Sequence, residues 1–113
     1  GLMMRTPTGS VAHAELDMGG ARLSLTESDG KDNRSPGELG GSPVILTWVC
    51  DDPDAVERRA IAAGGVVHFP VEDRFYGMRD GRFEDIAGHL WIVSKPLVSM
   101  SSDELEKAAL ENM

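Results

Sequence analysis

Apolar and polar residues alternate along much of the N-terminal part of the chain, a pattern typical of half-buried β-strands. We expect strands at 2–5, 11–16 and 21–26, joined by turns that contain glycine. Segment 43–50 is apolar at consecutive positions, which predicts a strand buried on both faces and therefore a central one. The polar stretch 27–42, rich in Gly, Ser and Asp, predicts a flexible linker.

The C-terminal part combines helical and strand patterns. A helix is expected over 54–63, begun by Asp51 or Asp52 with Pro53 in its first turn and ended by the Gly64-Gly65 pair. The other expected elements are a strand at 66–71, a loop at 72–77, a hairpin at 78–85 with its turn at Asp80-Gly81, a strand at 89–94 and a helix at 103–111 capped by Ser101 or Ser102.

A faint internal repeat relates the two halves of the chain. In each half a Met-Arg pair is followed by a glycine turn, then by a glutamate and, four residues later, by another glycine. The matching residues are Met4-Arg5, Gly9, Glu15 and Gly19 in the first half, and Met78-Arg79, Gly81, Glu84 and Gly88 in the second. Two unrelated hairpins can also match this well by chance.

The run from Pro70 to Trp91 reads PVEDRFYGMRDGRFEDIAGHLW. It resembles the PhnB-like subgroup of the vicinal-oxygen-chelate superfamily (glyoxalase, bleomycin resistance protein, dioxygenase), whose pattern is Pro-Val-x-Asp-x-Phe-(aromatic)-Gly-x-Arg-x-Gly followed by Asp-Pro-Phe-Gly-His-x-Trp. The segment His13-Ala14-Glu15-Leu16 and the tail with its Ser-Asp-Glu-Leu start are similar to that subgroup too.

The resemblance implies an α+β fold of paired βαβββ modules, the glyoxalase/bleomycin-resistance fold, with the first module lacking its first strand and helix. The single domain 1–113 then divides into a partial first module (1–26), a linker (27–42), a second module (43–94) and a C-terminal helical extension (95–113). The resemblance also implies a homodimer, and the apolar segment 43–50 agrees with that. Because a missing strand exposes a sheet edge, exchange of a strand or module between protomers is one way to close it.

Metal-dependent members of this superfamily bind a divalent ion through His and Glu in the first and last strands of each module. The corresponding positions here are Ile45, Ile92 and Leu23 or Ser24. Such side chains are poor ligands for Ni, Zn, Fe or Mn, so we expect no metal and no cofactor. The three histidines, His13, His68 and His89, also lack the spacing of a short metal-binding motif.

Charge and composition narrow the possible partners. The net charge is −8, from 19 acidic and 11 basic residues without a basic patch, so nucleic acid and anionic membranes are not expected to bind. A single cysteine, Cys50, excludes an internal disulfide and suits a reducing compartment. With no long apolar stretch and no secretory signal pattern at the N-terminus, we expect a cytoplasmic protein.

The candidate ligand-binding residues combine aromatic side chains with an arginine. An aromatic loop at Phe75 and Tyr76 can wall a concave sheet, and Arg79 can bind a carboxylate or phosphate in a bidentate manner. Alternatively, the two aromatic residues cover the end of the sheet and Arg79 pairs with Glu84 or Asp80. The full set of candidates is His13, Thr47, Phe75, Tyr76, Arg79, Glu84 and Trp91.

The candidates outside the aromatic loop also have structural alternatives. His13 can be a hydrogen-bonded residue of the sheet rather than a pocket group. Trp48 and Trp91 can belong to the core or to a dimer interface.

Three functions are compatible with these features. The first is a small-molecule binding protein of the bleomycin-resistance kind that needs no metal, favoured by the apolar residues at the metal positions. The second is a metal-dependent lyase, isomerase or dioxygenase of the same superfamily. The third is a non-catalytic, dimeric interaction module. Because one fold supports many chemistries, the resemblance does not identify the ligand.

Overall fold

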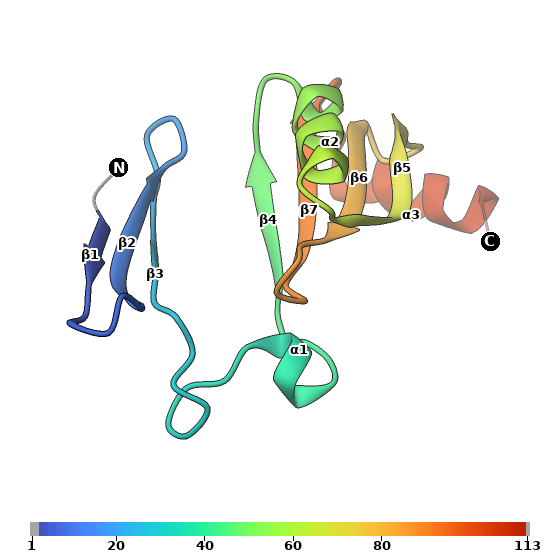
Figure 1. The fold of residues 1–113 in the computed structure, drawn as a ribbon. Helices are drawn as coiled ribbons and strands as arrows, with labels where there is room; N and C mark the ends of the chain where they lie inside the picture. Colours follow the sequence, from blue (N-terminus) through green and yellow to red (C-terminus); the bar gives the residue numbers. More distant parts are fainter. Residues whose placement is uncertain (1–2, 113) are drawn as a thin grey trace.

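Two separate β-sheets occupy the two ends of an elongated molecule that measures 55 × 29 × 26 Å (Figure 1). The structure, a computed structural model, describes residues 3–112. Leu2, the expected first residue of the first strand, lies outside the described residues, as do the ends of the expected single domain, Gly1 and Met113.

The N-terminal sheet is an antiparallel meander in the order β1-β2-β3. Its strands are β1 (Met3–Arg5), β2 (Val11–Asp17) and β3 (Arg22–Leu25), close to the expected positions. Leu16 pairs with Leu23 and Ala14 with Leu25, so one face of the sheet is apolar. Ala14 is buried, but Leu16 and Leu25 remain exposed because the helix that covers the other sheet, α2 (Pro53–Ala62), does not pack on this one.

The segment between the sheets, expected as a linker over 27–42, includes one short helix. It contains the short helix α1 (Pro36–Leu39), begun by a capping box in which Ser35 and Glu38 bond to each other's backbone N–H groups. The N–H group of Gly37 also donates to the carbonyl of Ala87, at 3.0 Å, which fastens α1 to the second sheet. Polar composition did not predict this helix, because its capping box depends on two particular residues three positions apart.

The second sheet has the order β4-β7-β6-β5 and mixes parallel and antiparallel pairs. The strands are β4 (Ile45–Val49), β5 (Val66–Asp73), β6 (Met78–Glu84) and β7 (Leu90–Pro96). β4 lies at the edge and pairs only with β7, so its predicted central position is wrong. Its apolar side chains point alternately to the face that a helix covers and to the uncovered face of the sheet.

β6 is one continuous strand, so the expected hairpin turn at Asp80-Gly81 is wrong. Gly81 does not adopt a positive φ. It is glycine because a Cβ atom would lie 2.7 Å from Val71 Cγ2 and 2.8 Å from the Val71 backbone nitrogen. The true turn comes earlier, at Gly77, whose φ is +82°.

The repeat holds for strand order but not for the whole residue alignment. Both β1-β2-β3 and β5-β6-β7 are antiparallel meanders, and Gly19 and Gly88 both lie in the second turn of their meander with positive φ. Met4-Arg5, however, lies in the first strand of its meander, whereas Met78-Arg79 begins the second strand of the other. Gly9 lies in the turn between β1 and β2, whereas Gly81 lies within β6, so the two glycines are not equivalent.

Helix α2 (Pro53–Ala62) covers one face of the second sheet. Asp52 caps it by accepting a hydrogen bond from the backbone N–H of Ala55, and Pro53 occupies its first turn, as the sequence predicts. The core beneath it consists of Val71, Phe83 and Val93, with Trp48, Cys50, Val56, Ala60, Val67 and Trp91 packed around them.

The chain ends with α3 (Ser102–Glu111), begun by the expected capping box of Ser101 and Glu104. Within residues 3–112, none of the helices has the length and apolarity that a bilayer crossing requires.

Candidate functional site

The face of the second sheet opposite α2, here called the open face, carries a row of side chains that crosses all four strands. The strand register places Phe69 opposite Arg82, Arg82 opposite Ile92, and Ile92 opposite Thr47. Because side chains alternate along a strand, the neighbours Phe83 and Val93 point to the opposite face and enter the core under α2.

A cleft of about 350 Å³ lies on this face at the β5–β6 side. Three aromatic residues, three charged residues, a glycine and an isoleucine line it: Phe69, Phe75 and Tyr76; Arg74, Asp80 and Arg82; Gly81; and Ile92. The turn between β5 and β6 supplies Phe75 and Tyr76, whose rings meet edge to face with their centroids 5.1 Å apart. This open-face cleft has the size and apolar character of a small-molecule site.

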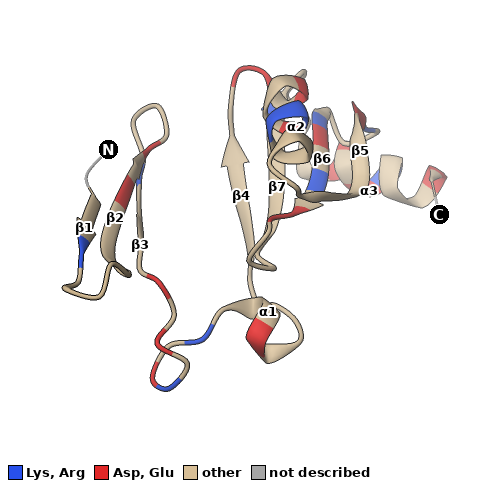
Figure 2. Ribbon diagram, viewed as in Figure 1, with Lys and Arg blue, Asp and Glu red and all other residues tan. Residues whose placement is uncertain are grey.

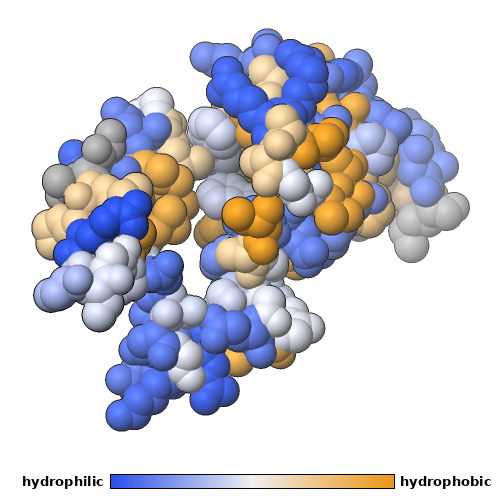
Figure 3. All heavy atoms as spheres, viewed as in Figure 1, coloured by the Kyte–Doolittle hydropathy of each residue, from blue (hydrophilic) through white to orange (hydrophobic). Residues whose placement is uncertain are grey.

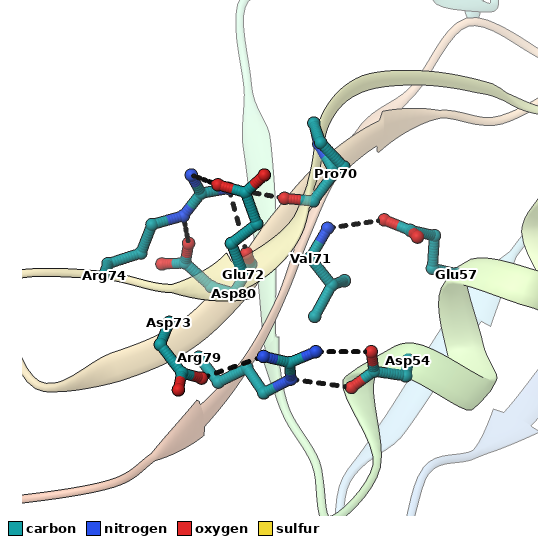
Figure 4. A network of polar contacts seen from close by, with 9 residues as sticks. All are labelled: Asp54, Glu57, Pro70, Val71, Glu72, Asp73, Arg74, Arg79 and Asp80. Atoms are coloured by element: carbon teal, nitrogen blue, oxygen red, sulfur yellow. Dashed lines mark hydrogen bonds and ion pairs between the residues drawn. The ribbon is translucent and has the colours of Figure 1, made fainter.

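Asp80 organises one wall of the cleft by accepting two hydrogen bonds. The Tyr76 hydroxyl donates to it at 2.6 Å, and Arg74 Nε donates at 3.0 Å. Arg74 also contacts Glu72 at 3.2 Å (Figure 4). Burial, together with the hydrogen bond to the charged Asp80, raises the pKa of Tyr76 to about 12, so its hydroxyl stays neutral near pH 7.

Arg82 lies in the cleft without a carboxylate partner. Its Nε atom is buried and has no hydrogen-bond partner among the described residues. None of the ion pairs within residues 3–112 includes it. Its guanidinium carbon lies 5.9 Å from the centre of the Phe69 ring, within range of a cation–π interaction.

Arg79, the predicted ligand-binding arginine, lies outside this cleft. Its Nε and Nη2 atoms donate to the two carboxylate oxygens of Asp54 at 2.8 and 2.7 Å, and its Nη1 atom donates to Asp73 at 2.9 Å (Figure 4). The hydrogen bonds from Arg79 lower the pKa of Asp54, and the two carboxylates raise the pKa of Arg79. Neither Glu84 nor Asp80, the expected partners, takes part, and the network connects α2 to β6.

The remaining candidates are dispersed over the molecule. His13 lies on the N-terminal sheet, 3.1 Å from Glu15, which also approaches Arg22 at 3.6 Å. Thr47 belongs to the open-face row but lines a different, smaller cavity of about 180 Å³ between the sheets. Glu84 follows Arg82 by two positions on β6 and does not line the cleft.

Trp91 lies on the core side of the second sheet. Its indole N–H donates to Asp85 at 2.9 Å, and Asp85 also accepts from the backbone N–H groups of Ala87 and His89. Burial opposes the charged form of Asp85, but these hydrogen bonds outweigh it and lower its pKa. Trp91 therefore stabilises the β6–β7 turn, and of the seven candidates only Phe75 and Tyr76 meet in the cleft.

Four of the residues that line the cleft are not among the sequence-based candidates: Phe69, Arg74, Asp80 and Arg82. The available signal was strand periodicity: in an unbroken strand over 78–84, positions 80 and 82 share a face. Placing a turn at Asp80-Gly81 removed that periodicity.

The described residues do not fit a divalent metal ion. Ile45, Ile92 and Leu23 have no donor atoms, and Ser24 alone is a weak ligand. Across residues 3–112, no group of three or more His, Cys, Asp or Glu side chains is arranged to hold a metal ion.

A second apolar cavity, of about 480 Å³, lies between the two sheets. Leu16, Leu23 and Leu25 of the N-terminal sheet face Leu46 and Trp91 across it. Hydrophobic residues are accordingly visible on the flank of the N-terminal sheet nearest β4 (Figure 3).

The chain is similar in sequence to a known protein family and to mycobacterial proteins. A family model described as the Glyoxalase/Bleomycin resistance protein/Dioxygenase superfamily matches residues 3–93. The uncharacterized protein Mb0911c of Mycobacterium bovis is 33% identical over 106 residues, covering 90% of this chain and 70% of the relative. For the uncharacterized protein Rv0887c of Mycobacterium tuberculosis the identity is also 33% over 106 residues, and this chain spans 62% of its length.

Among solved structures, TioX from Micromonospora sp. ML1 superimposes with a TM-score of 0.60 at 27% sequence identity. The alignment covers 88% of this chain and 80% of TioX.

Proposed function

Because the chain belongs to the Glyoxalase/Bleomycin resistance protein/Dioxygenase superfamily, we propose that it binds a small molecule in the open-face cleft and does so without a metal ion. Its α+β fold with mixed sheets is that of glyoxalase-like proteins. Within the superfamily we place it in the PhnB-like subgroup, on the basis of the run from Pro70 to Trp91.

The observation that carries the proposal is the composition of the open-face row. Phe69, Arg82 and Ile92 stand side by side on three neighbouring strands, where an apolar body and a cationic group can both contact one ligand. Phe69 and Phe75 are 56% and 46% exposed, so their rings are accessible to a ligand and are not buried in the core. Apolar walls with a few polar groups are typical of ligand sites.

Binding can be tested by titrating the EDTA-treated protein with naphthalene-2-carboxamide, a flat neutral probe, and following backbone amide shifts by NMR. We expect shifts on β5, β6 and β7 but not on β1 to β3. Replacing Phe69 with alanine removes one aromatic wall and is expected to weaken binding about tenfold, since an aromatic contact contributes about 0.5–1.5 kcal/mol beyond its buried area.

Leu39→Ala is the matched control, because Leu39 on α1 is also 56% exposed but lies outside the cleft. Binding that appeared only after Ni²⁺, Zn²⁺ or Mn²⁺ was added would contradict the metal-independent function. Equal weakening by Phe69→Ala and Leu39→Ala would contradict the location.

We also propose that two copies of the chain associate through their unpaired strand edges. β3 and β4 each end a sheet, and β4 carries no charged residue (Figure 2). Its sequence, ILTWV, contains no proline either. Exposed edges of monomeric proteins are normally protected by such residues. Pairing β3 of one copy with β4 of its partner would satisfy both edges and cover the leucines beside them.

Replacing Val49 with lysine is expected to shift a dimer to a monomer, because it places a charge on the β4 edge, where Val49 is 60% exposed. Sedimentation equilibrium should give twice 12.2 kDa for the unmodified chain and 12.2 kDa for the variant. Ile61→Lys, on the exposed side of α2, is the control and should remain dimeric. A monomeric unmodified chain at micromolar concentrations would rule out this association.

A further inference from the structure

We propose that the ligand of the open-face cleft is a small carboxylate with a flat apolar body, and that Arg82 binds its carboxylate group. The inference rests on the proposed function, because it assigns a ligand class to the same cleft. Its basis is a partly buried guanidinium group beside aromatic side chains, for which the described residues supply no carboxylate partner.

Among residues 3–112, Arg82 differs from the other two arginines around β6 in having no anionic partner. Arg79 bonds Asp54 and Asp73, and Arg74 bonds Asp80. Arg82 Nε, by contrast, is buried with its donor unused. Leaving a partly buried guanidinium group without an anionic partner is costly, so an anion bound at its terminal nitrogen atoms is favoured.

The charges that line the cleft also favour an anion. Arg74 and Arg82 contribute two positive charges and Asp80 one negative charge, which leaves a net charge of +1 in a chain of net charge −8. The Asp80 carboxylate is occupied by Tyr76 and Arg74. A cationic ligand would therefore have to displace Tyr76 or Arg74 from Asp80. An anion can instead bind the guanidinium group of Arg82, which has no carboxylate partner among the described residues.

The side chains that line the cleft indicate the shape and polarity of the rest of the ligand. Phe69 and Phe75 present exposed rings, Ile92 supplies an aliphatic surface next to Arg82, and the volume of about 350 Å³ is at the small end for ligand sites. A planar guanidinium matches a carboxylate in a bidentate manner, and a single excess positive charge matches a monoanion. A small aromatic or planar aliphatic carboxylic acid meets these requirements.

The test compares naphthalene-2-carboxylate with naphthalene-2-carboxamide, which has the same shape but no charge, by calorimetric or NMR titration of the full 113-residue chain. We expect the carboxylate to bind about tenfold more tightly or better, since hydrogen bonds to charged groups are stronger than neutral ones. Arg82→Met should abolish this preference and leave binding of the amide largely unchanged. Arg82→Lys, which keeps the charge but not the bidentate geometry, should retain part of it.

Arg58→Met is the matched control, because Arg58 is exposed on α2 and lies outside the cleft; it should leave the preference intact. Equal affinity for the two probes in the unmodified chain would overturn the carboxylate assignment while the proposed function stood. Binding of neither probe would overturn both. Inorganic phosphate that bound as tightly as the carboxylate would show that the site takes a phosphate instead, and would also overturn the assignment.

Discussion

Phe83→Ala is expected to lower the free energy of unfolding by about 3–5 kcal/mol, the usual cost of removing a buried phenylalanine. The effect should be large because the core is small. Only Val71, Phe83 and Val93 form its buried centre, and Phe83 is 7% exposed. Its ring lies between β6 and α2, where no neighbouring side chain can readily fill the space that it leaves.

Urea denaturation followed by tryptophan fluorescence measures this change, because Trp48 and Trp91 both pack against the same core. Phe75→Ala removes the same number of atoms from a residue that is 46% exposed, and it should change stability by less than about 1 kcal/mol. Similar losses for the two variants would show that the core under α2 does not dominate the stability of the chain.

The second large effect is expected for Gly81→Ala, which should destabilise the protein by about 1–3 kcal/mol through overpacking. The added Cβ atom would lie 2.7 Å from Val71 Cγ2 and 2.8 Å from the Val71 backbone nitrogen. A methyl group of a side chain can turn away, but the backbone of β5 cannot move without disturbing its pairing with β6. Thermal unfolding followed by circular dichroism should therefore show a clear fall in Tm.

Gly41→Ala is the control for this substitution. A Cβ atom at Gly41 would meet nothing within 4 Å, and its φ is not in the left-handed region. Its Tm should stay the same or rise slightly, because alanine restricts the unfolded chain more than glycine does. A Gly81→Ala variant as stable as Gly41→Ala would mean that β5 and β6 separate more easily than their register indicates.

Elements with local signals could be predicted from the sequence. The start of α2 follows from Asp52 and Pro53, and that of α3 from Ser101 and Glu104, because capping involves residues only a few positions apart. Asp80-Gly81 carries an equally clear local signal for a turn, yet it lies within β6. Contact with Val71 explains its glycine, and a contact between strands cannot be inferred from the dipeptide alone.

The continuity of β6 also decides how much of the candidate site the sequence can predict. Phe75 and Tyr76, which line the cleft, can be predicted because their loop is distinctive in sequence. Within a continuous strand, Arg82 shares the open face with Asp80, while Arg79 alternates to the side of α2, where Asp54 lies. Once the strand is read as unbroken, periodicity favours Arg82 over Arg79 as the arginine of the cleft.

The edge position of β4 differs from the predicted central one for another reason. A strand that is apolar at consecutive positions usually has neighbours on both sides. Here Leu46 and Trp48 turn toward the side that α2 covers, while Ile45 and Val49 stay exposed at an uncovered edge. Whether a partner covers that edge depends on association between chains, which apolar composition does not specify.

The pairing of β4 with β7 also affects the order in which the sheet assembles. β5, β6 and β7 follow one another through short turns, but α2, β5 and β6 all lie between β4 and its only neighbour in the sheet. Closing a longer loop costs more entropy, by about 0.6 kcal/mol for each doubling of its length. We therefore expect the β5-β6-β7 meander to form before β4 pairs with β7, which would leave the apolar strand β4 exposed until a late stage of folding.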